Sequence, residues 1–203
     1  MEEENLLAVL RLQKSKAIGD ILAKKLIVTV GDVAQIFKEK SATLQKINGI
    51  GSHAIKHLFD TENILKAKQE LAYIKKNKIQ YSYFLEDDYP YNLHNCIDSP
   101  ILLFKDGNIN LKNDKIISIV GTRNMSSYGR DFCNKLIEDL AEYNPIIISG
   151  FAYGVDICAH KAAVKNKLQT IAVLAHGFEQ IYPKVHTKHV NNVLKNGGFI
   201  SEF

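Results

Sequence analysis

The sequence predicts an α/β protein with a Rossmann-like, doubly wound, mostly parallel sheet that follows a small all-helical domain. From residue 116 onwards, short apolar runs alternate with helical segments, which is the βαβ rhythm of a parallel sheet. Residues 1–65 show only helical periodicity, interrupted by glycines and free of proline. We therefore expect a helical domain over residues 1–65 and an extended Rossmann-like domain over residues 66–203.

The helical region contains a weak internal repeat. Ile18-Gly19, followed by Lys24 and Leu26, aligns with Ile50-Gly51, followed by Lys56 and Leu58. The second copy carries Gly49 as well as Gly51, and this Gly-x-Gly turn between two helices resembles a helix-hairpin-helix motif. Two glycines allow a sharp turn and a close approach of backbone amides to a phosphate. Two interpretations stay open: a DNA phosphate contact at Gly49 and Gly51, or simple turns of a helical bundle.

The remaining elements follow in order along the chain. Residues 66–80 form a Lys-rich helix whose charges face solvent, and 81–84 and 101–104 are short strands. The apolar run 116–120 reads as a buried parallel strand ended by glycine. The later elements are helices over 127–143, 156–164 and 186–196 and strands over 146–148, 170–174 and 199–200.

Composition excludes several classes of protein. Of 203 residues, 46% are hydrophobic and 24% charged, which is globular rather than disordered. No apolar run approaches the roughly 20 residues that span a bilayer. The three cysteines form no CxxC pair, so neither a disulfide framework nor a metal site is expected, and a reducing compartment fits best. The net charge of +4 permits nucleic-acid binding without requiring it.

The first loop at the carboxyl end of the predicted sheet has the chemistry of a phosphate cradle. Ligands of such sheets sit beyond the carboxyl ends of the strands. Gly121 allows the turn, Thr122 offers a hydroxyl and Arg123 a guanidinium, while Ser126 or Ser127 caps the next helix. Only three of the 26 basic residues are arginines, and an arginine fork grips phosphate in a way that lysine cannot.

The second loop, residues 149–156, has two glycines that leave its backbone open to close approach. We expect Asp156 to cap the helix that carries His160 and Lys161. The Asp156–His160 pair admits a catalytic interpretation or a local packing one. Packing is favoured, because no nucleophile or metal-ligand set accompanies the pair, and we assign no catalytic residue.

The third loop, residues 175–183, carries Phe178, which either stacks on a base or pins the loop to the core. Neither GxGxxG at the first strand–helix turn nor the P-loop pattern is present. The sequence therefore predicts no cofactor of either class.

Taken in order, these motifs resemble the DNA-processing protein A (DprA/Smf) family. The resemblance spans nearly the whole chain. The matching blocks are Val120-Gly121-Thr122-Arg123, Ser127-Tyr128-Gly129, residues 149–156 with Ala159-His160, residues 170–174 with Gly177 and Tyr182-Pro183, and Gly197-Gly198 with Ser201-Glu202.

The resemblance implies a cytoplasmic, non-enzymatic protein that binds single-stranded DNA and has no cofactor. Members protect incoming DNA during natural transformation (competence), load a RecA-type recombinase in DNA recombination, and form homodimers through the Rossmann domain. A second resemblance, to nucleotide-binding enzymes of the lysine-decarboxylase-like phosphoribohydrolase type, is the alternative. Their Pro-Gly-Gly-x-Gly-Thr loop is absent from this sequence.

Carried over residue by residue, the family likeness implies that Arg123 holds a backbone phosphate. Lys161 would neutralise a neighbouring phosphate, and Tyr153, where many members carry a basic residue, would stack on a base. The family's sheet continues past Phe203 through an Arg-Asn-Arg segment, so we expect a domain that is incomplete at this end. The other expected phosphate contacts are the amides of Gly121, Thr122, Ser149 and Gly150, with Ser126 beside them.

Overall fold

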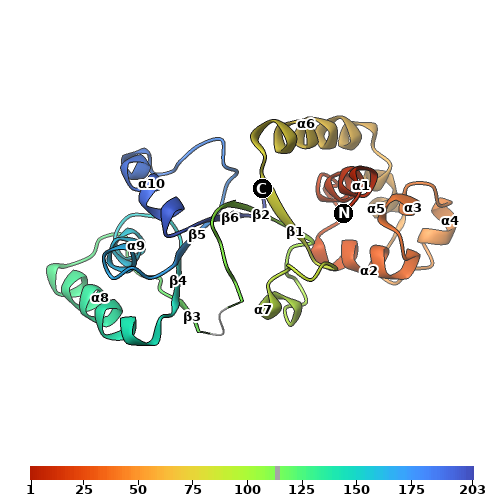
Figure 1. Ribbon diagram of the computed structural model, residues 1–203. Coiled ribbons are helices and arrows are strands. Elements are labelled where there is room, and N and C mark those ends of the chain that lie inside the picture. Colours follow the sequence, from red (N-terminus) through yellow and green to blue (C-terminus); the bar gives the residue numbers. More distant parts are fainter. Residues whose placement is uncertain (113–114) are drawn as a thin grey trace. The chain divides into compact units, whose positions relative to one another are not determined.

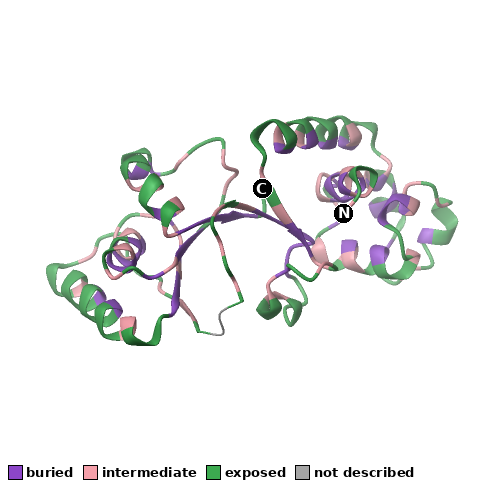
Figure 2. Ribbon diagram, viewed as in Figure 1, coloured by how far each residue is buried: buried purple, intermediate pink, exposed green. Residues whose placement is uncertain are grey.

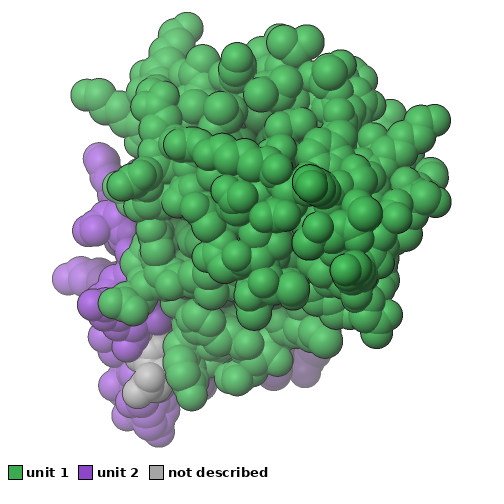
Figure 3. All heavy atoms as spheres, turned by 90° about the vertical axis from the view of Figure 1, so that its right-hand side faces the viewer, with its two compact units in different colours: residues 1–102 green, residues 103–203 purple. Residues whose placement is uncertain are grey.

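The computed structural model describes residues 1–112 and 115–203, which form two compact units, Met1–Leu102 and Leu103–Phe203 (Figure 3). Each unit has buried side chains of its own (Figure 2). None of the helices in the described part of the chain is both long and apolar enough to cross a bilayer.

The first unit is built from short helices, as its periodicity predicts (Figure 1). Gly19 and Gly51 are the N-cap residues of the second and fifth helices, so the predicted interruptions at these glycines are confirmed. The elements are α1 (Glu3–Gln13), α2 (Asp20–Val30), α3 (Val33–Ile36), α4 (Ser41–Leu44), α5 (Ser52–Leu58), α6 (Thr61–Asn77), β1 (Gln80–Tyr83) and α7 (Tyr91–His94).

The core of this unit lies where α1 packs against α3 and α6. Leu10 and Leu12 of α1 and Leu58 of α5 are fully buried in this unit. The compact unit therefore includes α6, which begins at Thr61, and it ends later in the chain than the domain boundary expected after residue 65. That boundary stays a prediction about domain organisation.

The second unit contains most of a six-stranded sheet with the order β1-β2-β6-β5-β4-β3. Strands β3 to β6 are parallel, and β2 runs antiparallel to β6. The predicted α/β class with a Rossmann-like, mostly parallel sheet is confirmed. Its elements are β2 (Leu102–Gly107), β3 (Ile116–Ser118), α8 (Ser127–Leu140), β4 (Ile146–Ser149), α9 (Val155–Lys165), β5 (Thr170–Leu174), α10 (Thr187–Lys195) and β6 (Gly197–Ser201).

Helices α8, α9 and α10 lie along one face of these strands (Figure 1). Each right-handed crossover moves the chain one strand further in the same direction, which keeps the helices together. The core beneath them contains Ile137 from α8, Ala159 from α9 and Ile147 from β4, all fully buried. This packing brings the N-terminal turns of α8 and α9 to the carboxyl end of the sheet.

The expectation of a buried strand over 116–120 is wrong. Strand β3 covers three residues, none of them buried, and Val120 beyond it is 76% exposed. Its place at the end of the strand order explains the difference, because among the described strands it pairs only with β4. Apolar composition resembles that of a central strand, but burial depends on neighbours that composition does not report.

Candidate functional site

The loop after β3 is folded by its own hydroxyl groups. The Ser126 hydroxyl accepts a hydrogen bond from the Gly129 amide at 3.1 Å, so Ser126, rather than Ser127, is the N-cap of α8. The Thr122 hydroxyl accepts from the Asn124 amide, also at 3.1 Å. These bonds hold Arg123 between two locally fixed residues.

Glycine lets the loop after β4 pack directly against the loop after β3. Gly154, the N-cap of α9, has φ +79°, and a Cβ there would lie 2.1 Å from the Thr122 carbonyl oxygen. The Val155 amide donates to that oxygen at 3.2 Å. Only glycine accommodates both the backbone angle and the close approach. Arg123 is thereby placed beside the first turn of α9.

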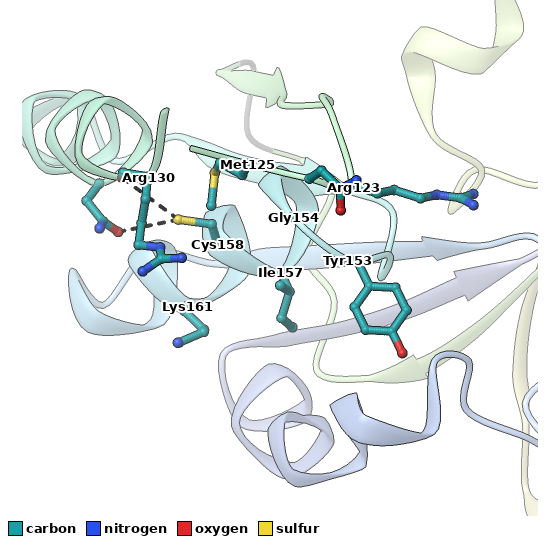
Figure 4. Close-up of a pocket in the computed structure, with 10 residues that line it drawn as sticks. Arg123, Met125, Arg130, Tyr153, Gly154, Ile157, Cys158 and Lys161 are labelled. Atoms are coloured by element: carbon teal, nitrogen blue, oxygen red, sulfur yellow. Dashed lines mark hydrogen bonds between the residues drawn. The ribbon is translucent and has the colours of Figure 1, made fainter. Parts of the chain in front are cut away.

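A pocket of about 550 Å³ lies between the β3–α8 loop, α8 and α9 (Figure 4). Three cationic side chains line it: Arg123, Arg130 and Lys161. No Asp or Glu is among the described lining residues, so positive charge is concentrated there. Arg130 and Lys161 lie at one end of the view, and the Arg123 side chain extends away at the other. The remaining lining residues are Asn124, Met125, Asn134, Tyr153, Gly154, Ile157 and Cys158.

Arg130 is a site residue that motif reasoning missed. It lies in α8 four residues after Ser126, and Asn134 follows it by four more, so both share one side of the helix. The scarcity of arginine was the available signal, because Arg130 is one of only three in the chain. Its position opposite Lys161 required the packing of α8 on α9.

His160 positions the second loop, which confirms the local packing interpretation. Its Nε2 donates to the Gly150 carbonyl, and the Thr170 hydroxyl lies 2.7 Å from Nδ1. Burial lowers the pKa of His160 to about 4, so the ring is neutral near pH 7. A neutral ring carries one proton, and the Gly150 carbonyl, which can only accept, places that proton on Nε2. The imidazole thus ties the loop after β4 to strand β5.

The expected cap of α9 is wrong. The N-cap is Gly154, and Asp156 lies inside the first helical turn, where it is buried. A Cβ at Gly150 would lie 2.5 Å from one Asp156 carboxylate oxygen. Asp156 therefore packs beneath the loop, a position that its spacing from β4 did not distinguish from a cap.

The structure brings three expected site residues into the pocket, Arg123, Tyr153 and Lys161. Tyr153 is 45% exposed and packs edge-to-face on His186, with ring centroids 5.2 Å apart. Ser149 is buried, and its hydroxyl donates to the Ile119 carbonyl at 2.6 Å. The residues outside the pocket lining are Gly121, Thr122, Ser126, Ser149 and Gly150.

Phe178 and the hairpin glycines lie elsewhere. Phe178 is partly buried against the core cluster around Phe151 and Phe199, which is the pinning interpretation. Gly49 and Gly51 belong to the first unit, where Gly49 has φ +94°. No group of three or more potential metal ligands occurs in the described ranges.

Comparison with known proteins gives a consistent result. Residues 80–203 match the family described as DNA recombination-mediator protein A. The chain is 36% identical to a DNA processing protein DprA of Bacillus subtilis over 115 residues, or 56% of this chain and 39% of that protein. It is 26% identical to a protein Smf of Synechocystis over 192 residues, or 93% of this chain and 48% of that protein.

Two solved structures are also similar. The crystal structure of DprA from Streptococcus pneumoniae has a TM-score of 0.76 at 28% identity, with 97% of this chain and 67% of that chain covered. DprA from Helicobacter pylori, described for its single-stranded DNA binding mode, has a TM-score of 0.51 at 29% identity, with 61% and 56% covered. The chain spans 39% and 42% of the length of the Bacillus and Streptococcus relatives.

Proposed function

The chain belongs to the DNA recombination-mediator protein A family, and on that premise we propose that it binds single-stranded DNA in DNA processing and recombination. The observation that carries this proposal is the pocket lined by Arg123, Arg130 and Lys161 without a carboxylate. Cations that surround a pocket attract the phosphate backbone, which is common to every nucleotide sequence. Binding is therefore expected to be insensitive to sequence and sensitive to salt.

Within this proposal each side chain has a role that its chemistry supports. Arg123 binds a backbone phosphate through its guanidinium fork, and Lys161 binds a neighbouring one. Arg130 shares the end of the pocket with Lys161 and adds a second fork. Tyr153 offers a partly exposed ring on which a base can stack.

Backbone groups supplement these side chains in the proposal. The first turn of α8, which Ser126 caps, presents amides without intrahelical partners. Further phosphate contacts are proposed for four amides at the carboxyl ends of β3 and β4. They are those of Gly121 and Thr122 after β3, and of Ser149 and Gly150 at the end of β4. Gly49 and Gly51 are proposed as a separate phosphate contact in the hairpin of the first unit.

The finer role also rests on the family. We propose that the bound single strand is protected from degradation and handed to a RecA-type recombinase. We further propose that the protein pairs with a second copy through its Rossmann-like domain. These two statements concern the whole protein, and they are tested by nuclease protection, by RecA filament formation and by sedimentation.

The pocket itself is tested by charge removal with a matched control. Arg123→Gln and Arg130→Gln should each weaken binding of a fluorescent oligo-dT by about 1–3 kcal/mol, or about 5-fold to 150-fold, because each removes a charge-assisted hydrogen bond. Lys135→Gln removes a cation from α8, the helix that carries Arg130. Lys135 pairs with Asp139 and lies outside the pocket. Its affinity should match that of the parent protein. Equal affinities for all four proteins would refute the assignment.

A further inference from the structure

Two buried cysteines belong to one packed cluster beside the cationic pocket. Cys133 lies on α8 and Cys158 on α9, and both belong to the cluster that joins these helices to the sheet. The Cys158 sulfur lies 4.0 Å from the Arg130 carbonyl oxygen and 3.7 Å from the Asn134 side-chain oxygen, which places it against the turn of α8 that carries Cys133. Both thiols are free. Cys96, the remaining cysteine, is exposed in the first unit.

The two thiols differ in their access to solvent molecules. Cys158 lines the pocket, and its sulfur lies 3.7 Å from the Asn134 side-chain oxygen (Figure 4). Cys133 is packed in the cluster with Ile137 and Ile147. Burial first, and then the Cys158 neighbour, raise the pKa of Cys133 to about 12. A small molecule that enters the pocket therefore reaches Cys158 before Cys133.

We propose that Cys158 and Cys133 are an oxidisable thiol pair, which hydroperoxides convert into a disulfide between α8 and α9. The Cys158 thiolate attacks one peroxide oxygen, the O–O bond breaks, and hydroxide leaves beside Arg130 and Lys161. Cys158 is then a sulfenic acid. The Cys133 thiol attacks the Cys158 sulfur, the S–S bond forms as the S–O bond breaks, and the thiol proton leaves with the hydroxyl group as water. In total two thiols and one hydrogen peroxide give one disulfide and two waters.

The position of the pair connects its redox state to the pocket. Cys133 is three residues after Arg130 in α8, and Cys158 is three residues before Lys161 in α9. One turn of helix therefore separates each sulfur from one of the two cations that share an end of the pocket. A covalent link at this place joins the two helices that carry those cations. The pair stands independently of the DNA proposal, because it needs only the packing of α8 on α9.

The test uses the full chain, treated with hydrogen peroxide, alkylated and digested for mass spectrometry. We expect a linked Cys133–Cys158 peptide pair, lighter by two hydrogens than the separate peptides, that dithiothreitol separates again. Cys96 is the internal control, because its exposed thiol reports the peroxide dose. Oxidation of Cys96 with both buried thiols still open to alkylation after unfolding would overturn the proposal.

Two serine variants test the order of attack. Cys133→Ser should accumulate a sulfenic acid at Cys158 that dimedone labels, because the resolving thiol is gone. Cys158→Ser should leave Cys133 unmodified at the same dose, because Cys133 faces the core. Equal labelling of both variants would contradict the assigned roles. The linked peptide in the unmodified chain is scored separately, so a variant that folds poorly does not decide the outcome.

Discussion

The close contact between the two loops at Gly154 makes a stability prediction with a calculable size. Gly154→Ala places a Cβ 2.1 Å from the Thr122 carbonyl oxygen and 2.7 Å from the Arg123 Cα, where both neighbours are backbone. Gly154 also has φ +79° and ψ −124°, a conformation that costs a residue with a side chain about 1–3 kcal/mol. The loops must separate, because backbone atoms cannot rotate away as a side chain can.

Separation of the loops also breaks the hydrogen bond from the Val155 amide to Thr122, which contributes about 1 kcal/mol. The variant should thus lose about 3 kcal/mol of unfolding free energy, a large share of the roughly 5–15 kcal/mol that a domain has. The affinity for oligo-dT should fall with it, because Arg123 and Tyr153 flank the displaced backbone.

The assay is equilibrium unfolding in urea, with Gly177→Ala as the matched control in the same unit. A Cβ at Gly177 would meet the Phe203 carbonyl oxygen at 3.4 Å, an ordinary contact, and the backbone there has no positive φ. The control should stay within about 1 kcal/mol of the parent protein. If Gly154→Ala unfolds at the same urea concentration as Gly177→Ala, the packing argument for the two loops is wrong.

Two further predictions concern protons and salt. Burial lowers the pKa of His160 from 6.5 to about 4, so between these pH values the unfolded chain binds a proton at His160 that the folded chain does not. The free energy of unfolding therefore falls by up to about 3 kcal/mol as the pH drops through that range. The difference in unfolding free energy between the parent and His160→Gln should shrink over this interval, and a constant difference would contradict the buried neutral ring. Replacing Arg123, Arg130 and Lys161 together by Gln should flatten the slope of log K against log salt by about 2, at about 0.7 for each phosphate contact with a single strand. An unchanged slope between about 50 and 200 mM salt would show that these cations do not bind phosphate.

Local features were readable from the chain because their causes are local. A serine cap at Ser126 or Ser127 was recognisable because a hydroxyl that accepts from an amide of the next turn needs no distant partner, and the structure assigns it to Ser126. Gly19 and Gly51 marked helix starts for a similar reason. The Gly121-Thr122-Arg123 segment could be placed at the carboxyl end of a strand because strand, turn and helix follow one another directly in sequence.

Other features depended on which segments become neighbours. The sequence indicates Asp156 as the cap, because its position after a strand gives no sign that Gly154 occupies that place against Thr122. Strand β3 was expected to be buried, because an apolar run does not reveal that only one side of it is paired. In both cases the deciding fact is which segments, far apart in the chain, lie next to each other in the fold.

The sequence by itself determined the α/β class, the order of its elements, and the loop that carries Arg123, since periodicity and turn chemistry act over a few residues. Only the tertiary structure decided that Arg130 and Lys161 share a pocket with Arg123. It also decided that Cys133 and Cys158 belong to one buried cluster. The physical reason is that α8 carries Arg130 and Cys133 while α9 carries Lys161 and Cys158, and the distance between two helices is a property of the core that they share.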